Sequence, residues 1–238
     1  MKKIMIATVI SGLMCTSISH AGNMGPISTS VMPNIIFGSI EGSYTWNDIS
    51  PFKLNNHTSG ESVQHWGGRL AGGVIHPVTE KLSLSAEVGG GYYGSNKLSA
   101  PLAGWNANTG IDGYDILLGA LYKLNLFDIF GDVGFMAQNQ RVHVNQQLER
   151  SLPGGLFSGQ TSNKFNTTQI LPEIKVGGIY NLNDNWGISL AYIHVFGSNL
   201  QNTTRINAAP SSIVINGTAN VENTTLNAIM LGLRYSIA

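Results

Sequence analysis

The sequence predicts an all-β protein, an eight-stranded antiparallel up-and-down transmembrane β-barrel. The first observation is an alternation of apolar residues with small or polar ones, which is clearest over residues 226–238 and recurs seven times upstream. The second is that the connections between these segments are alternately short and long. The third is a composition with only 11% charged residues and 29 glycines. Alternating segments of about ten residues with weak hydropathy are typical of strands that turn one face to lipid and the other to a lumen.

The N-terminal residues 1–21 are interpreted as a secretory signal peptide. Lys2 and Lys3 precede an apolar run from Ile4 to Met14, and a small-x-small cleavage motif ends at Ala21. The apolar run is too short to span a bilayer, which favours a cleaved leader over a membrane helix.

The remaining chain is divided into a short periplasmic segment, residues 22–33, and an outer-membrane barrel, residues 34–238. The one cysteine, Cys15, lies in the leader, so the mature chain is expected to have no disulfide and no thiolate metal site. Without Lys2 and Lys3, eleven basic residues remain against thirteen acidic ones. This charge balance does not predict nucleic-acid binding.

The first four strands are expected at residues 34–46, 65–76, 82–93 and 114–124. Each has an apolar face and a face of small or polar residues, as a strand between lipid and lumen requires. The apolar faces carry, in chain order, Ile36 and Ile40; Trp66, Leu70 and Val74; Leu82, Leu84, Ala86 and Val88; and Ile116 and Leu118.

The last four strands are expected at residues 129–137, 169–180, 186–196 and 226–238. Their apolar faces carry Val133 and Phe135; Ile170, Ile174 and Val176; Ile188 and Leu190; and Ile229, Leu231 and Leu233. Residues 138–147 still read as extended, so the fifth strand is expected to project past the membrane. Pro172 removes a ladder donor, which predicts a bulge or a later start of the sixth strand.

The connections predict which end of the barrel faces which compartment. Three are tight turns, at residues 77–80, 125–128 and 181–185. Four are long and polar, at residues 47–62, 94–113, about 145–168, and 197–223. Short periplasmic turns that alternate with long extracellular loops, with both termini periplasmic, are typical of a bacterial outer-membrane barrel of even strand number. The alternative is a secreted β-sandwich, but nothing in that fold requires short and long connections to alternate.

The aromatic residues are expected to form two girdles, one at each membrane interface, where amphipathic rings are favoured. If the first strand runs outward, the outer girdle contains Tyr44, Trp46, Trp66, Tyr92 and Tyr114. The inner girdle contains Tyr122, Tyr180, Trp186 and Tyr235.

Six charged residues are expected to face the lumen, because a charge that faces hydrocarbon costs several kcal/mol. They are Glu41, Arg69, Glu87, Glu173, Lys175 and Arg234. We expect Glu41 to pair with Arg69, and Glu173 or Lys175 to reach Arg234 or Glu87. Eight strands enclose only enough space for side chains, so the charges form either a polar plug or a gate that passes small ions.

The segment from Pro172 to Trp186, followed by Tyr192 and His194, resembles the OmpA-like and opacity-type outer-membrane barrels. The resemblance implies a transmembrane barrel without the peptidoglycan-binding domain of larger members, and a surface, adhesive, membrane-stabilising or narrow-pore role. The C-terminus is similar to the assembly signal that the barrel-assembly machinery reads, carried here by Gly232, Tyr235 and Ile237.

An enzymatic role is weighed and set aside. His194 and Ser198 superficially resemble the catalytic pair of lipid A deacylases, but their spacing differs, and Pro210 lies where an acid would follow. The other histidines show no metal-ligand spacing, so no catalytic, metal or cofactor site is expected.

The function expected from these patterns is a structural or adhesive surface role through four extracellular loops. Trp105 and residues 152–157 are apolar points in those loops, which either pack over the barrel mouth or contact a partner. The expected partners are outer-membrane lipid and lipopolysaccharide, the barrel-assembly machinery, and a host or cell-surface receptor. The alternatives are a narrow porin with a salt-bridge-gated lumen and, third, a lipid A-modifying enzyme.

Overall fold

The structure is a computed structural model that describes residues 33–48, 52–54, 57–59, 62–100, 105–152, 155–208, 215–223 and 225–237. The expected signal peptide and nearly all of the expected periplasmic segment lie outside these residues. Within the described ranges, no helix has the length and apolar character needed to cross a membrane.

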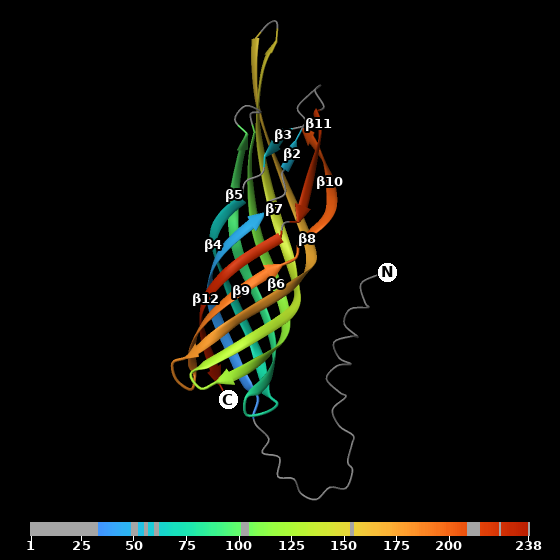
Figure 1. Ribbon diagram of the computed structural model, residues 1–238. Coiled ribbons are helices and arrows are strands. Elements are labelled where there is room, and N and C mark those ends of the chain that lie inside the picture. The colour runs from blue at the N-terminus through green and yellow to red at the C-terminus, as the bar shows by residue number, and fades with distance from the viewer. Residues whose placement is uncertain are drawn as a thin grey trace, which may run out of the picture. The chain divides into compact units, whose positions relative to one another are not determined.

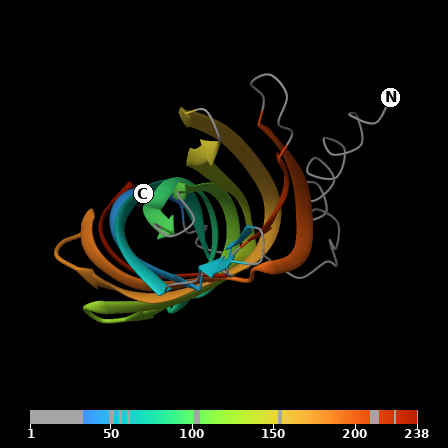
Figure 2. The same ribbon diagram turned by 90° about the horizontal axis from the view of Figure 1, so that it is seen from above.

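Eight strands form a closed antiparallel β-barrel, which confirms the predicted fold class (Figures 1 and 2). The strand order around the barrel is β1-β12-β9-β8-β7-β6-β5-β4. The bounds are β1 Ile35–Asp48, β4 Ser62–Pro77, β5 Leu82–Ala100, β6 Trp105–Leu124, β7 Phe127–Leu152, β8 Gly155–Asn181, β9 Trp186–Val195 and β12 Thr225–Ile237. Because β1 pairs with β12 on one side and with β4 on the other, the sheet closes without a free edge.

The three tight turns lie where the sequence predicts them, at one end of the barrel, which we call the turn end. They connect β4 to β5, β6 to β7 and β8 to β9 through residues 78–81, 125–126 and 182–185. In the two-residue turn, Asn125 has a φ of 23°, in the left-handed region that asparagine tolerates better than most residues. The start of β1 and the end of β12 pair at this same end, Ile36 opposite Ile237.

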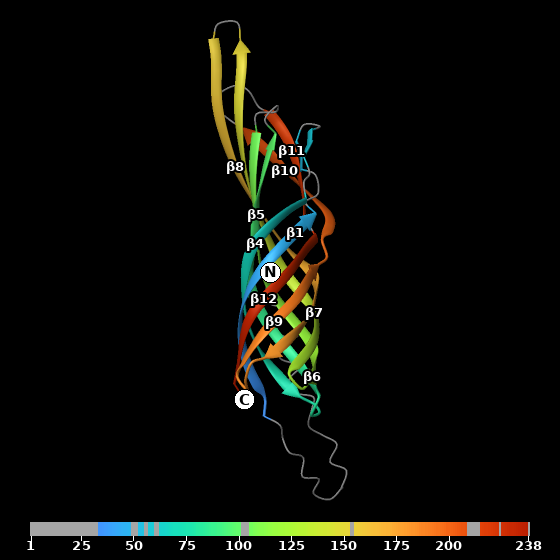
Figure 3. The ribbon, with the colours of Figure 1, turned by 60° about the vertical axis from the view of Figure 1, so that its left-hand side comes forward.

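At the opposite end, the loop end, two expected loops are instead extended hairpins. β5 and β6 stay paired out to Ala100 and Trp105, and β7 and β8 out to Leu152 and Gly155 (Figure 3). The predicted projection of the fifth strand is therefore confirmed, but most of the residues expected in the loops 94–113 and 145–168 are strand. A ladder in water does not need an apolar face toward lipid, so these segments show only a weak alternation, as at Val142 and Val144. The side chains of Trp105 and of residues 152–157 are outside the described set.

The other two expected loops contain a second sheet. The four strands β2 (Phe52–Leu54), β3 (His57–Ser59), β10 (Ser198–Ala208) and β11 (Ile215–Asn223) pair in the order β10-β11-β2-β3. β2 and β3 belong to the connection between β1 and β4, and β10 and β11 to the connection between β9 and β12. Segments more than 140 residues apart in the chain are thus joined by backbone pairing, Asn220 opposite Lys53.

Pro172 causes neither the bulge nor the later strand start that the sequence predicts. β8 runs through it in unbroken register with β7, Pro172 opposite Phe135. Its carbonyl accepts a hydrogen bond from the Phe196 amide at 3.0 Å, which shows that its polar groups face β9. β9 ends at Val195, opposite Glu173, so the missing N–H lies where that ladder stops.

A β-bulge that the sequence did not reveal interrupts β5 near the loop end. Tyr92 lies opposite Asp112 and Ser95 opposite Gly110, so β5 has one extra residue between the two pairs. Gly94 provides the special conformation with a φ of 107°. The bulge buries Tyr93 in the lumen while Tyr92 and Ser95 remain exposed on the outer wall.

Replacement of Gly94 by alanine is expected to lower the free energy of unfolding by about 1–3 kcal/mol, because this φ is strained for any residue with a Cβ. The new Cβ would also lie only 2.9 Å from His65 Cγ. The measurement is urea unfolding of the refolded barrel in phospholipid vesicles. Gly38→Ala is the control, since its Cβ would meet no atom closer than 3.9 Å. Equal stability of the two variants would contradict the role given to the bulge.

Candidate functional site

The outer wall of the barrel is a continuous belt of exposed apolar side chains. Ile40 is 68% exposed, and Leu70 on the neighbouring strand is 63% exposed. The other members of the belt include Ile36, Val74, Leu84, Val88, Ile116, Leu118, Val133, Phe135, Ile174, Val176, Leu190, Ile229, Leu231 and Leu233. An exposed apolar surface of this extent is rare in proteins that fold in water and is typical of a lipid-facing barrel wall.

The nine aromatic residues assigned to girdles all lie on the outer wall, and several of them contact other aromatic rings. Toward the loop end, Tyr44 lies edge-on to Trp66 at 5.1 Å, and Trp46 lies 6.2 Å from Tyr192 between ring centroids. Toward the turn end, Trp186 and Tyr235 are 4.8 Å apart. Tyr92, Tyr114, Tyr122 and Tyr180 are likewise exposed. Of the assembly-signal residues, Tyr235 and Ile237 face outward while Gly232 is buried in the lumen.

The lumen contains a buried ionic network centred on Arg69 of β4. Its guanidinium Nη1 lies 2.7 Å from a Glu41 carboxylate oxygen and Nη2 lies 2.7 Å from one of Glu87. The Asp115 carboxylate accepts two further bonds, from Nε at 2.9 Å and from Nη2. Lys175 Nζ binds the other Glu41 oxygen at 3.0 Å and Glu87 at 2.8 Å. Side chains from β1, β4, β5, β6 and β8 therefore meet at one level, which we call the ionic layer.

Two lumen-facing glycines provide the space that the ionic layer occupies. A Cβ on Gly89 would lie 2.7 Å from Arg69 Nε. A Cβ on Gly232 would lie 2.6 Å from Ser189 Oγ and 2.9 Å from Glu41 Cγ. The packing that holds two cations against three carboxylates depends on these positions having no side chain, because buried charges must approach closely to offset their desolvation.

Apolar layers lie on both sides of the ionic layer, with polar lumen side chains such as Ser39, Asp132 and Gln138 between their members. Toward the loop end, the buried side chains are Tyr93, Ile111, Met136, Leu171, Ala191, Ile193, Val195, Leu226, Ala228 and Met230. Toward the turn end, they are Phe37, Ile75, Leu121 and Ile179, with Phe130 packed against them. The space left beside Glu41, Glu87 and Lys175 is a cavity of about 20 Å³, close to the volume that one water occupies. The lumen is therefore filled by side chains at the level of the ionic layer.

The structure does not pair two of the six predicted lumen charges. Arg234 forms no ion pair with any described carboxylate, and its guanidinium instead lies 3.6 Å from the centroid of the Phe37 ring. Arg234 is opposite Ser39, whereas Gly232 is opposite Glu41, so Arg234 lies one inward position closer to the turn end than the ionic layer. The prediction that Glu173 or Lys175 reaches Arg234 or Glu87 holds only for Lys175 and Glu87.

Glu173 is the second charge without a partner. Its side chain is about 1% exposed, and neither carboxylate oxygen has a hydrogen-bond partner among the described residues. It lies on β8 two residues from Lys175, opposite Gly134 of β7 and Val195 of β9. Val195, its partner on β9, and Leu171, two residues before it on β8, belong to the apolar layer toward the loop end.

Sequence reasoning missed three buried carboxylates, Asp115, Asp128 and Asp132, although the alternation contains the signal for the first and the last. Asp115 lies between Tyr114 and Ile116, which were both placed on the outer face, so it must face inward. Asp132 precedes the outward Val133 and accepts a hydrogen bond from Ser85 Oγ at 2.9 Å. Asp115 matters most, because it is the third carboxylate that Arg69 binds.

No family model matches the sequence, and no curated protein sequence matches it. Among solved structures, the chain is similar to Ail, the attachment invasion locus protein of Yersinia pestis, at 12% identity and a TM-score of 0.47 over 87% of this chain and 100% of that one. It is also similar to the outer membrane protein OprG of Pseudomonas aeruginosa, at 13% identity and a TM-score of 0.47 over 86% and 95%. The outer membrane protease OmpT of Escherichia coli matches at 12% identity and a TM-score of 0.42 over 86% and 95%. The similarity to these solved structures concerns the barrel architecture and gives no information on ligands.

Arg69→Ala is expected to lower the free energy of unfolding by about 3–5 kcal/mol, because it leaves three buried carboxylates with only Lys175 to compensate them. Arg234→Ala is the matched variant and is expected to cost about 1 kcal/mol or less, since it removes a buried cation that has no described ion partner. Urea unfolding in vesicles measures both. A cost for Arg234→Ala as large as that for Arg69→Ala would overturn the assignment of the ionic layer.

Glu173→Gln is expected to leave stability unchanged or to raise it at pH 8, because a buried carboxylate without a partner costs more than a neutral amide of the same shape. Glu41→Gln is expected to be destabilising under the same conditions, since Glu41 binds both Arg69 and Lys175. Unfolding curves of the two variants, recorded side by side, make the comparison. A loss of stability in Glu173→Gln equal to that in Glu41→Gln would show that Glu173 has an ionic partner.

Proposed function

We propose that the chain is a bacterial outer-membrane surface protein whose barrel is a closed anchor and whose loop end interacts with molecules outside the cell. The observation that carries this proposal is the lumen, in which an ionic layer lies between two apolar layers and leaves beside it a cavity of only about 20 Å³. The apolar outer wall supports the membrane placement, and the aromatic residues at its two ends support the position of the interfaces.

The length of the strands supports exposure of the loop end. A membrane-spanning β-strand needs about 9–11 residues, whereas β7 has 26 and β8 has 27. The excess lies at the loop end, where the exposed positions of β7 and β8 carry polar residues such as Asn139, Arg141, Lys164 and Asn166. The four-stranded sheet of β2, β3, β10 and β11 arises from connections at the same end. Such rigid display of polar segments suits an adhesive or receptor-binding role, with a host or cell-surface receptor as the partner.

Assembly and lipid contacts follow from the same placement. Gly232, Tyr235 and Ile237 lie on the strand that closes the barrel against β1, which is the element we propose the barrel-assembly machinery reads. Outer-membrane lipid and lipopolysaccharide are the proposed surroundings of the apolar wall.

A narrow porin with a salt-bridge-gated lumen is the second candidate, and Glu173 is the observation that favours it. A gate needs a second set of partners, and the unpaired Glu173 carboxylate lies two residues along β8 from Lys175. Movement of Lys175 from Glu41 and Glu87 to Glu173 would break part of the ionic layer. The apolar layers on both sides of it would still oppose ion passage, which is why the closed barrel is preferred.

We propose no catalytic role. His194 Nδ1 and the Tyr192 hydroxyl both bind Asn227 Oδ1 at 2.7 Å, and Phe196 lies edge-on to the His194 ring at 4.4 Å between centroids. These contacts support His194 as a structural group of the outer rim. The Ser198 side chain lies outside the described set.

Single-channel recording separates the two candidates. The refolded mature chain in a planar bilayer is expected to give no stable openings, and Glu41→Ala and Arg69→Ala are expected to stay closed as well, because the two apolar layers remain. The control for insertion is a shift in gel mobility between folded and heated protein. Discrete openings whose size or selectivity changes in the variants would establish the gated porin instead.

A further inference from the structure

The apolar outer wall has a groove floored by glycine. On the outward positions of β4, β5 and β6, Leu70, Gly90 and Tyr114 lie side by side, and Gly72 and Val88 form the next row toward the turn end. A shallow, open hollow of about 550 Å³ lies above these residues. Gly72 presents only backbone to it, while the ring of Tyr114, which is 71% exposed, packs over Gly90 as its wall and would lie 2.8 Å from a Cβ on that glycine.

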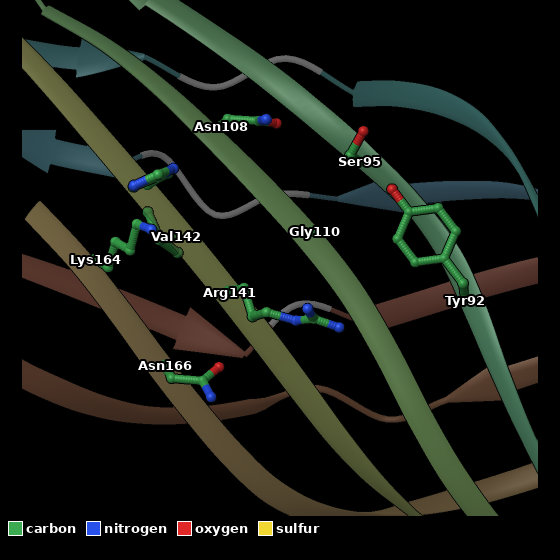
Figure 4. Close-up of a pocket in the computed structure, with 9 residues that line it drawn as sticks. Tyr92, Ser95, Asn108, Gly110, Arg141, Val142, Lys164 and Asn166 are labelled. Atoms are coloured by element: carbon green, nitrogen blue, oxygen red, sulfur yellow. The ribbon is translucent and has the colours of Figure 1, made fainter. Parts of the chain in front are cut away.

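A polar pocket of about 530 Å³ lies on the same wall, further toward the loop end (Figure 4). Ser95, Gly110, Arg141 and Asn166 follow one another across β5, β6, β7 and β8 in register. The next row adds Asn108 of β6, His143 of β7 and Lys164 of β8. Tyr92 borders the pocket on the side of the groove. The pocket is therefore lined by cationic and neutral polar groups, with no acid among its lining residues.

Asp112 joins the groove to the pocket. It lines the loop-end edge of the groove, and its carboxylate accepts a bond from Arg141 Nε at 2.9 Å and from Asn139 Nδ2 at 3.1 Å. Arg141 remains 63% exposed in this pair, and no described residue forms an ion pair with Lys164. One negative charge thus faces two fixed positive charges, so this part of the wall is cationic.

The height of this wall relative to the membrane limits what can occupy it. Tyr92 and Tyr114 belong to the outer girdle and mark the interface between hydrocarbon and headgroups. The groove lies on the hydrocarbon side of that level and the pocket on the polar side. An occupant of both must have an acyl chain below the interface and an anionic, hydroxyl-bearing head directly above it.

We propose that the groove and the pocket together form one binding site for an acylated, phosphorylated saccharide, the lipid A portion of lipopolysaccharide in the outer leaflet. An acyl chain lies along Gly72 and Gly90, and a phosphate binds Lys164 and Arg141, which are the donors suited to it. The amides of Asn108 and Asn166 bind sugar hydroxyls. The inference rests on the proposed outer-membrane placement, and it assigns one lipid to one face of the barrel rather than a general lipid coat.

The test measures lipid binding to the full mature chain refolded in a neutral detergent, by native mass spectrometry. The probes are bis-phosphorylated lipid A, its dephosphorylated form, phosphatidylglycerol and inorganic phosphate. Lipid A is expected to bind in a one-to-one complex and the dephosphorylated form about tenfold more weakly, because charge-assisted bonds to phosphate are lost. Equal binding of phosphatidylglycerol would show a general anionic-lipid surface and overturn the assignment, as would binding of inorganic phosphate as tight as that of lipid A.

Two substitutions in or beside the polar pocket are expected to change lipid A binding in opposite directions. Lys164→Ala is expected to weaken lipid A binding about tenfold, whereas Asp112→Asn is expected to strengthen it about threefold by freeing Arg141. The control is Lys81→Ala, which removes a charge from the turn between β4 and β5 at the opposite end. A purely structural role of Asp112 predicts weaker binding in Asp112→Asn, and that result would overturn the proposed electrostatics.

A matched glycine pair tests the groove. Gly72→Leu fills it, and the first added atom meets Phe37 O at an ordinary 3.4 Å. Gly131→Leu is the control on the outward face of β7, where a Cβ would meet nothing within 4 Å. Lipid A binding is expected to fall at least about fivefold in Gly72→Leu and to stay unchanged in Gly131→Leu. Equal effects would refute the groove, whereas failure of the wild-type chain to insert into vesicles would refute the membrane placement itself.

Discussion

Arg69 is the group around which the barrel interior is organised. Its guanidinium binds carboxylates from β1, β5 and β6, and Lys175 of β8 binds two of the same carboxylates from the other side. A small barrel must fill its lumen with side chains, and a buried ion is tolerated only with close partners. Five of the eight strands thereby have their relative positions tied to one set of atoms. The glycines at 89 and 232 are required by the same packing, since any side chain there would displace a charged group.

The filled lumen is the reason that the proposed interacting surfaces lie on the outside of the barrel. Its charges pack between two apolar layers. The surfaces that remain are the polar hairpins and small sheet at the loop end, and the outer wall where the aromatic rim separates apolar from polar residues. The bulge in β5 matters at that rim, because it keeps both Tyr92 and Ser95 on the outer face.

The strands change character along their length without losing their pairing. β7 and β8 have an apolar outer face near the turn end and a polar outer face beyond Gln138. The backbone ladder continues, because each residue of β7 remains paired with a residue of β8 both beside lipid and in water. The lipid-facing part of the barrel and the hairpin that projects at the loop end are thus made from the same two strands, in continuous register.

The sequence by itself determined the fold class, the number of barrel strands, the three tight turns and the inward direction of the charges. All of these follow from an alternation with a period of two, which is visible wherever the two faces of a strand meet different surroundings. The same alternation contained Asp115 and Asp132, which were overlooked. Only the tertiary structure decided that Arg69 binds three carboxylates, that Arg234 lies over Phe37, and that the expected loops are strands. The ion pairs across the lumen depend on the relative height of non-adjacent strands, which a local sequence pattern does not contain. The strands within the expected loops lie in water, where no clear alternation marks them.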